Sequence, residues 1–201
     1  MSPSDAFSGD RIGPADIVRL ASSMGSRVRI GIDGPGGSGK SRLAAELIRC
    51  WPTAATLVHG DDFGRPTIDP AWSEQRIGGL FDLARLATEM LDPHEHDAPI
   101  RYRRYDWSED RLGEWITAPH DGTLIVEGVY CTHPSIRDRY HYRIWVEADR
   151  ATRLARGLAR DGEEARSRWE DVWMPVEDRY RAEHRPDAAA DLVIDTTYSR
   201  C

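Results

Sequence analysis

Gly34-Pro35-Gly36-Gly37-Ser38-Gly39-Lys40-Ser41 matches the spacing G-x-x-x-x-G-K-S in full. A short β-branched run at residues 27–32 precedes it, and residues 40–50 follow it with apolar side chains at helical spacing. In the order strand, loop, helix, the glycines let the backbone curl so that several N–H groups point inward, and the helix adds its positive end. The segment therefore predicts a loop that binds nucleotide phosphates. The plainer alternative is a glycine-rich turn that binds nothing.

Lys40 is the only lysine among the 27 lysine and arginine residues of the chain. An ammonium is a compact point charge, whereas the planar guanidinium is larger and more rigid, so lysine suits a closed phosphate site. We expect Lys40 to reach the β- and γ-phosphates of ATP and Ser41 to coordinate Mg²⁺. The residues expected to bind these cofactors are Gly34, Pro35, Gly36, Gly37, Ser38, Gly39, Lys40, Ser41 and Arg42.

The composition is that of one domain, residues 1–201, with 40% apolar and 30% charged residues. A net charge of −7 argues against a nucleic-acid surface, which needs a broad basic patch. Cys50, Cys131 and Cys201 lack metal or redox spacing and predict free thiols in a reducing compartment. No apolar run approaches transmembrane length, and the N-terminus lacks a signal-peptide core. We therefore expect a cytoplasmic protein that does not bind membranes, and a homo-oligomer remains open.

Strands and helices alternate along the chain. Strands are expected at residues 27–32, 55–59, 123–126, 143–146 and 192–194, and helices at 14–24, 40–50, 80–91, 150–161 and 163–184, the last with a break near Pro175. Residues 1–10 are expected to be loose, 64–79 to form a loop with a short helix, 92–99 to break the preceding helix, and 100–114 to form a short hairpin or a substrate-facing loop. The alternation predicts an α/β fold: a three-layer α/β/α sandwich of the P-loop NTPase type, with a parallel sheet and a small helical lid at about residues 150–170.

Two carboxylates follow strands at the sheet edge where open α/β folds bind ligands. Asp61 follows the strand at 55–59, and Glu127 follows the strand at 123–126. Near a metal-bound phosphate, a carboxylate can accept a proton from an attacking hydroxyl or hold Mg²⁺. We assign Asp61 as the base and Glu127 as the Mg²⁺ partner. Asp62 remains the alternative base, with the other aspartate of the pair capping a turn, and Asp33 is expected to make a structural hydrogen bond.

Arg153, Arg156 and Arg160 are spaced i, i+3 and i+7, which places them on one face of a helix. Such a stripe can close over a triphosphate and stabilise charge on a moving phosphoryl group. It is also typical of a solvated helix face, and both interpretations stay open. The residues assigned to catalysis are Asp61, Lys40, Arg156 and Arg160.

Taken in order, several segments resemble the uridine kinase family, part of the broader group that includes phosphoribulokinase, pantothenate kinase and nicotinamide riboside kinase. They are residues 30–41, His59-Gly60-Asp61-Asp62-Phe63, Tyr105-Asp106-Trp107, residues 125–129 and residues 153–161, and the likeness covers about residues 27–195. The resemblance implies Mg·ATP-dependent transfer to a primary hydroxyl. It implies that Asp61 is the catalytic base, that Asp82 holds ribose hydroxyls, that Tyr105 lies beside the acceptor's base, and that Arg156 and Arg160 belong to the lid.

The residues expected to bind the acceptor are Asp61, Phe63, Asp82, Tyr105 and Arg104. Arg104 belongs to a basic cluster with Arg101 and Arg103 that suits a phosphate or carboxylate on the acceptor. The chain departs from the family in two places. The histidine that reads the pyrimidine, five residues after the tyrosine, is Asp110 here, and a second consecutive lid arginine is replaced by Gly157. Kinase chemistry is therefore implied, and pyrimidine specificity is not.

The function expected from the sequence is an ATP-dependent kinase of a small-molecule hydroxyl, most nearly the 5′-hydroxyl of a nucleoside. Two alternatives stay open: a kinase of another acceptor (nicotinamide riboside, pantothenate, a sugar or a nucleoside monophosphate), and a non-catalytic ATP-binding switch or regulatory protein. Asp61-Asp62-Phe63-Gly64 also fits the D-x-x-G pattern of GTPases. The guanine-reading N-K-x-D motif cannot occur in a chain without asparagine, which disfavours a GTPase of the usual kind.

Overall fold

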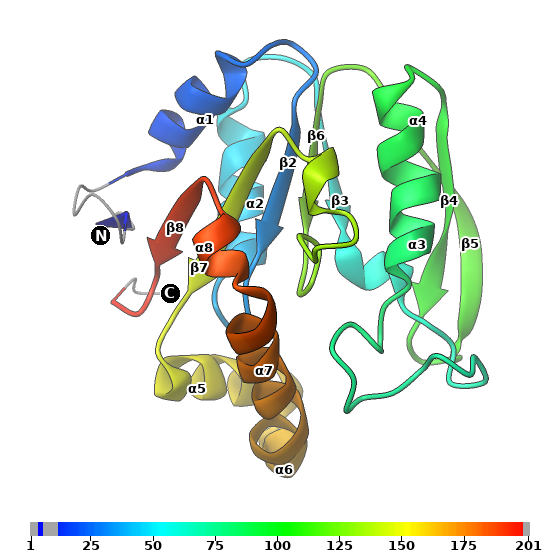
Figure 1. Cartoon of the computed structure of the whole chain (residues 1–201), viewed down its shortest axis with the longest axis vertical. Helices are drawn as coiled ribbons and strands as arrows, with labels where there is room; N and C mark the ends of the chain where they lie inside the picture. Colours follow the sequence, from blue (N-terminus) through cyan, green and yellow to red (C-terminus); the bar gives the residue numbers. More distant parts are fainter. Residues whose placement is uncertain (1–3, 6–11, 199–201) are drawn as a thin grey trace.

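The main sheet of the computed structural model, which describes residues 4–5 and 12–198, has the strand order β1-β8-β7-β2-β6-β3 (Figure 1). Five of these strands are parallel: β2 (Arg29–Asp33), β3 (Ala55–His59), β6 (Thr123–Glu127), β7 (Tyr142–Glu147) and β8 (Leu192–Asp195). The expected parallel sheet is confirmed, and each expected strand agrees with its observed bounds to within two residues. Of residues 1–10, Ser4–Asp5 form β1, antiparallel to β8, and the others lie outside the described residues.

One face of the sheet is covered by α1 (Pro14–Ser22) and α2 (Lys40–Cys50). Ile17 of α1 and Leu47 of α2 are fully buried against Ile30 and Ile32 of β2, because alternate side chains of a strand point to the same face. Both helices expected here are confirmed. The apolar stripe of α2, which begins directly at Lys40, therefore holds the end of the glycine loop against the sheet.

The opposite face carries two further core clusters. Val58 and Val126 pack beneath α3 (Leu83–Leu86) and the following helical turns, while Trp145 and Val193 pack beneath α7 (Met174–His184) and α8 (Pro186–Ala189). Neighbouring residues of one strand thus enter different cores, as Leu192 and Val193 do. Helices on both faces of a parallel sheet make the expected three-layer α/β/α arrangement.

Two helical runs continue through prolines where breaks were expected. Residues 83–95 form α3, the π-helical turn η2 (Ala87–Leu91) and α4 (Asp92–Glu95), so the expected break at 92–99 begins only after Glu95. Residues 166–184 form α6 (Arg166–Arg168), the π-helical turn η5 (Trp169–Trp173) and α7, so the expected break near Pro175 is wrong. In both runs the wider π turn directly precedes the segment that starts with Asp92-Pro93 or Met174-Pro175, which relieves the clash of a proline ring with the preceding turn.

The segment expected as a hairpin or a substrate-facing loop is a hairpin. It consists of β4 (Ile100–Asp106) and β5 (Arg111–Ala118), with a register shift between Arg103 and Tyr105. Residues 64–80 form turns without the expected short helix, joined to the start of α3 by a bridge between Gly64 and Phe81. The remaining short elements are η1 (Gly60–Phe63), η3 (Arg137–Arg139) and η4 (Glu163–Ala165).

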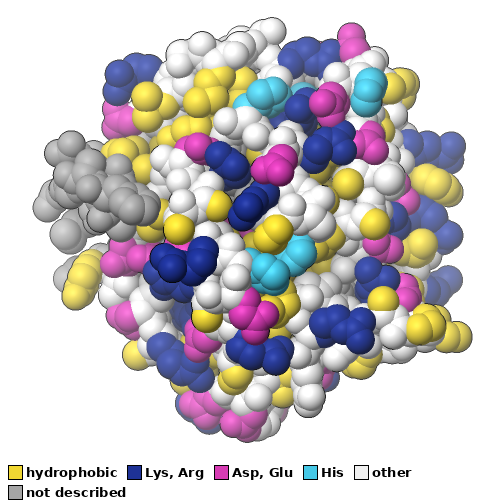
Figure 2. All heavy atoms as spheres, in the orientation of Figure 1, with side chains coloured by type: hydrophobic (Ala, Val, Ile, Leu, Met, Phe, Trp, Pro, Cys, Tyr) yellow, Lys and Arg dark blue, Asp and Glu magenta, His cyan; other side chains and the backbone are white. Residues whose placement is uncertain are grey.

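The helix α5 (Arg150–Asp161), α6 and part of α7 lie beyond the carboxyl ends of the parallel strands (Figure 1). This is the end of the sheet at which the glycine loop, Asp61 and Glu127 emerge. On the face shown in Figure 2, basic and acidic side chains are interspersed. Within the described part of the chain, no helix is both long and apolar enough to cross a membrane.

Candidate active site

The glycine loop is a tight backbone turn that only glycine accommodates at several positions. Gly34, Gly37 and Gly39 have φ values of +149°, +74° and +97°. A Cβ atom on Gly34 would lie 2.0 Å from the carbonyl oxygen of Val146, and one on Gly37 would lie 2.5 Å from that of Arg153. The loop is therefore wedged between the end of β7 and the backbone of α5, and no side chain larger than hydrogen fits there.

The loop's polar groups fit a phosphate ligand. Lys40 is 7% exposed, and its Nζ donates to the Pro35 carbonyl at 3.0 Å, so the ammonium lies across the loop. Ser38 is fully buried, and among the described residues its Oγ has no hydrogen-bond partner. A buried polar atom without a partner is costly unless a ligand or water satisfies it. The turn, the ammonium and the hydroxyl together suit a polyphosphate chain.

Glu127, the expected Mg²⁺ partner, lies beside Ser41 and His59. The register of β3 and β6 places His59 opposite Glu127, with 2.6 Å between Nδ1 and Oε1, and the Ser41 hydroxyl donates to the same oxygen at 3.1 Å. Burial opposes ionisation of Glu127, but the His59 hydrogen bond and the charges of Lys40 and His59 outweigh burial and lower its pKa. The hydrogen bond to Glu127 raises the pKa of His59.

The pair Ser41 and Glu127 fits Mg²⁺, which prefers oxygen ligands and completes its shell with water and nucleotide phosphates. Across the part of the chain that the structure describes, no group of three His, Cys, Asp or Glu side chains could hold a metal ion by itself. A hydroxyl and one ionised carboxylate next to the phosphate loop therefore match a metal that arrives with the nucleotide. His59, which the sequence pattern placed only at a strand end, orients this carboxylate.

The two neighbouring aspartates have different environments. Asp62 is 8% exposed, accepts a hydrogen bond from the Tyr102 hydroxyl at 2.8 Å and lies 3.1 Å from Arg104 Nε. Asp61 is solvent-accessible, and its carboxylate has no hydrogen bond or ion pair within residues 12–198. Asp62 is thus held in a structural network, whereas Asp61 presents an unengaged carboxylate.

The charges around Asp61 come from the loop, the metal side and the lid. Packing around the carboxylate, followed by the negative charge of Glu127, raises the pKa of Asp61, while the positive charges of Lys40, Arg160 and His59 oppose that rise. The same groups therefore share one electrostatic environment with Asp61. A carboxylate with a raised pKa is a stronger proton acceptor than an ordinary aspartate, which suits a general base.

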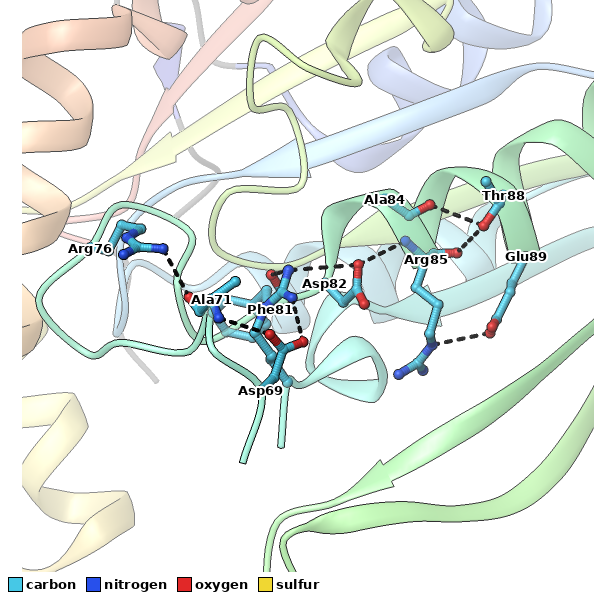
Figure 3. A network of polar contacts seen from close by, with 10 residues as sticks. Asp69, Ala71, Arg76, Phe81, Asp82, Ala84, Arg85, Thr88 and Glu89 are labelled. Atoms are coloured by element: carbon cyan, nitrogen blue, oxygen red, sulfur yellow. Dashed lines mark hydrogen bonds and ion pairs between the residues drawn. The ribbon is translucent and has the colours of Figure 1, made fainter. Parts of the chain in front are cut away.

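Asp82 begins α3 (Figure 3). Its Oδ1 accepts from the Arg85 N–H at 3.0 Å and lies 3.7 Å from Arg65 Nη2, and its own N–H donates to the Phe63 carbonyl at 2.8 Å. One oxygen thus caps the helix, and the backbone contact joins Asp82 to the segment that carries Asp61. The expectation for Phe63 needs correction, because its ring is fully buried and stacks on Tyr102, so it packs the core instead of facing the acceptor.

Tyr105 packs edge-on to Trp107, with ring centroids 4.7 Å apart, and its hydroxyl donates to Asp110 Oδ1 at 2.5 Å. Asp110 also accepts from the N–H and the hydroxyl of Thr67. Burial, together with the hydrogen bond to Asp110, raises the pKa of Tyr105 to about 12. Asp110, at the position where the family is expected to have its pyrimidine-reading histidine, therefore joins the hairpin to the loop at 64–80.

The basic cluster of the hairpin is dispersed in the structure. Arg101 lies over the ring of Trp115, 4.3 Å from its centroid, and Arg103 donates to the carbonyls of Gly113 and Leu112. Arg104, the member assigned to the acceptor, pairs with Asp62. The cluster therefore does not form one anion site, because the alternation and the register shift of β4 turn its members to different neighbours.

The arginine stripe of α5 runs from a buried residue, Arg153, to an exposed one, Arg160, whose side chain is 66% exposed. Arg153 is 5% exposed, and its Nη1 lies 3.8 Å from Glu177 Oε2. Arg156 donates to the Gly37 carbonyl at 3.2 Å and to the Thr196 carbonyl at 2.9 Å, so it joins the phosphate loop to the end of β8. Arg160 pairs with Asp161 at 2.6 Å and shares the electrostatic environment of Asp61.

The packing around position 157 explains why a glycine stands there. A Cβ atom there would lie 2.5 Å from two ring atoms of Trp169, which is 1% exposed and donates through Nε1 to Asp161 at 3.0 Å. The same ring lies over Gly36, where a Cβ atom would approach to 2.8 Å. Trp169 thus occupies the space above α5 and the phosphate loop, which excludes an arginine at 157.

Several residues at the site were not identified from the sequence. Among them are Phe81 and Tyr130, which form an aromatic group with Trp107 of the segment Tyr105-Asp106-Trp107 already named from the sequence. The ring centroid of Phe81 lies 6.0 Å from that of Trp107 and 6.0 Å from that of Tyr130, and Trp107 Nε1 donates to the Asp61 carbonyl at 3.0 Å. Glu177 accepts from the Gly36 N–H. Tyr130 has a positive φ of +67°, and no sequence signal pointed to it or to Glu177.

Comparison with models of known protein families finds no match. Among curated proteins, uridine-cytidine kinase C of Dictyostelium discoideum is 23% identical over 173 residues, which cover 82% of this chain and 38% of that protein. The uridine kinase of Macrococcus caseolyticus is 26% identical over 156 residues, covering 74% and 76%. A solved structure described as a possible uridine kinase from Bacillus stearothermophilus superposes with a TM-score of 0.66 at 20% identity, covering 90% of this chain and 97% of that one.

The structural likeness establishes the fold. The chain spans well under half of the Dictyostelium protein and about three quarters of the Macrococcus protein. In fold the chain is a P-loop NTPase-type α/β/α sandwich, and in sequence and structure it is similar to uridine kinases.

Proposed function

We propose that this protein is an ATP-dependent kinase that transfers the γ-phosphate to a hydroxyl group of a small molecule, most nearly the 5′-hydroxyl of a nucleoside. One observation carries the proposal: Asp61, without a partner for its carboxylate among the described residues, shares its electrostatic environment with Lys40, Arg160 and Glu127. A proton acceptor, two cations and a carboxylate able to hold a metal are the parts that phosphoryl transfer requires.

In the proposed reaction, the oxygen of the acceptor hydroxyl attacks the γ-phosphorus while Asp61 accepts the hydroxyl proton. The bond between the γ-phosphorus and the β-phosphate oxygen breaks at the same time. Lys40 and Arg160 stabilise the charge on the transferring group. Ser41 and Glu127 hold Mg²⁺, which neutralises phosphate charge when bound. The remaining loop residues, from Gly34 to Arg42, position the nucleotide.

Asp82 and the aromatic group support a nucleoside as acceptor. One Asp82 oxygen caps α3, which leaves the other for ribose hydroxyls, and Trp107 is 49% exposed beside Asp61. Tyr105 packs edge-on against the ring of Trp107 and holds that ring in place. An exposed indole edge next to a carboxylate suits a ligand with a flat ring at one end and hydroxyls at the other.

A second candidate is a kinase of an acceptor without a pyrimidine, such as nicotinamide riboside, pantothenate, a sugar or a nucleoside monophosphate. The observation that favours it is Asp110, whose Oδ1 and Oδ2 both accept hydrogen bonds from Thr67 or Tyr105. A carboxylate so engaged does not read a base edge. A phosphate-bearing acceptor is favoured less, because Arg104 is paired with Asp62.

The test is ATP consumption with a panel of nucleosides, nicotinamide riboside, nucleoside monophosphates, pantothenate and sugars, with product masses determined. The Asp61→Asn variant should bind Mg·ATP like the wild type and lose transfer by about a thousandfold or more. Asp62→Asn is the matched control, since it changes the adjacent carboxylate, and should keep transfer within about tenfold. Full transfer by Asp61→Asn would refute the assignment of the base. ATP binding with no transfer to any compound would favour a regulatory protein.

A further inference from the structure

Glu177 is a buried carboxylate that the proposed reaction does not use. It lies on α7 and is 8% exposed, and its Oε1 accepts a hydrogen bond at 3.0 Å from the N–H of Gly36, 141 residues earlier in the chain. A hydrogen bond between a backbone N–H and a carboxylate is stronger than one between neutral groups. Through this contact, α7 is joined directly to the phosphate loop.

The turn at Gly36 and Gly37 is enclosed by both ends of the segment expected to form the lid. The backbone of Arg153 on α5 lies against Gly37, and the ring of Trp169 lies against Gly36. Arg153 Nη1 is 3.8 Å from Glu177 Oε2, and both side chains are less than 10% exposed. The arginine therefore offsets the negative charge that Glu177 brings to a phosphate site.

Among the described residues, a single hydrogen bond reaches the Glu177 carboxylate, at Oε1. Oε2 is buried and accepts no hydrogen bond within the described ranges. Burial raises the pKa of Glu177, while the Gly36 N–H and the charges of Lys40 and Arg153 oppose the rise. A neutral amide of the same shape could thus keep the Oε1 contact, which makes the Gln variant informative.

We propose that Glu177 is a positioning residue for the nucleotide: its hydrogen bond with the Gly36 N–H holds residues 35–37 in the shape that receives the phosphates. The inference rests on the proposed function, since it concerns the same nucleotide site. Glu177 acts through Gly36, and the neighbouring Arg153 keeps its charge from repelling the phosphates. Without this contact, the part-buried Gly36 N–H would lose its hydrogen-bond partner.

Calorimetric titration with Mg·ATP tests the proposal without knowledge of the acceptor. Glu177→Ala should weaken binding by about tenfold or more, the scale of a lost hydrogen bond to a charged group. Glu177→Gln retains an acceptor oxygen and should bind within about threefold of the wild type. Glu183→Gln, which removes an exposed carboxylate from the same helix, is the matched control and should bind like the wild type.

Hydrogen exchange of the peptide covering residues 30–43, measured without nucleotide, provides the second readout. The peptide should exchange faster in Glu177→Ala, and Glu177→Gln should restore its protection. Unchanged affinity and exchange in a folded Glu177→Ala protein would overturn the proposal. Binding by Glu177→Gln that is more than about threefold tighter than that of the wild type would overturn it too, because the carboxylate would then oppose the phosphates. Failure of the wild type to bind Mg·ATP would count instead against the proposed function, and the exchange result would still decide the role of Glu177 in the loop.

Discussion

Replacing Gly157 by alanine tests the packing of Trp169 over the phosphate loop. In an ordinary helix interior, glycine to alanine stabilises by about 1 kcal/mol. Here the added methyl carbon would lie 2.5 Å from Cε2 and Cζ2 of Trp169, whereas carbon atoms pack at about 3.5–4.0 Å. The ring cannot withdraw easily, because Nε1 is bonded to Asp161 and its far edge rests on Gly36.

Overpacking of this kind costs about 1–3 kcal/mol, which exceeds the gain in helix propensity. Subtracting the gain of about 1 kcal/mol in helix propensity, we expect Gly157→Ala to lower the free energy of unfolding by up to about 2 kcal/mol. It should also weaken Mg·ATP binding, because the displaced indole lies against Gly36. The clash thus reverses the sign of a substitution that would otherwise stabilise α5.

Urea unfolding followed by circular dichroism is the assay, since a signal from tryptophan would change with the ring itself. Ala155→Gly, on the exposed side of the same helix, measures propensity alone and should cost about 1 kcal/mol. In a double-mutant cycle with Trp169→Phe, the smaller ring should relieve the clash and give a coupling energy of about 1 kcal/mol or more. A Gly157→Ala protein about 1 kcal/mol more stable than the wild type would refute the reasoning.

Three further predictions concern the reaction. Packing around the carboxylate and the negative charge of Glu127 raise the pKa of Asp61, and only its ionised form accepts a proton, so kcat/KM should fall as the pH drops through that raised value. A wild-type acid limb at or below the ordinary aspartate value of about 3.9 would contradict this. Lys40→Ala should abolish transfer and weaken calorimetric Mg·ATP binding, and unchanged turnover would rule out the loop as the phosphate site. Arg156→Ala should lower transfer and raise the Kd for Mg·ATP by about tenfold, because the guanidinium holds the Gly37 and Thr196 carbonyls. Arg150→Ala, at the exposed start of the same helix, is the control. Equal effects of the two substitutions would show that Arg156 is only a surface residue.

Local patterns predicted much of the fold because they reflect local physics. The bounds of α2, α5 and β3 agree with the expected ones residue for residue, since the glycine loop starts α2, Asp149 caps α5 and a short apolar run fills β3. The helix breaks predicted at the prolines at 93 and 175 are absent at those positions, because the rule that proline ends a helix does not take account of a π turn just before the proline. Asp33 was expected to be structural, and it accepts hydrogen bonds from Gly34, Tyr130, Thr132 and Tyr180.

The candidate site was predicted in part. Strand ends pointed to Asp61 and Glu127 because parallel strands present their carboxyl ends at one edge. The same pattern could not separate Asp61 from Asp62, which differ only through Tyr102 and Arg104 on a distant hairpin. The sequence also predicted, wrongly, that Phe63 binds the acceptor. Whether a side chain is buried depends on what packs over it, and a local pattern does not show this.

The residues alone determine the phosphate loop, the positions of the strands along the chain and the single ammonium within the loop, because each depends on spacing over a few consecutive positions. Only the folded chain brings Glu177 onto Gly36 and Trp169 onto Gly157, and only there does His59 meet the Glu127 carboxylate. These contacts join residues that are separated in the sequence, and their geometry follows from how whole helices and strands pack together.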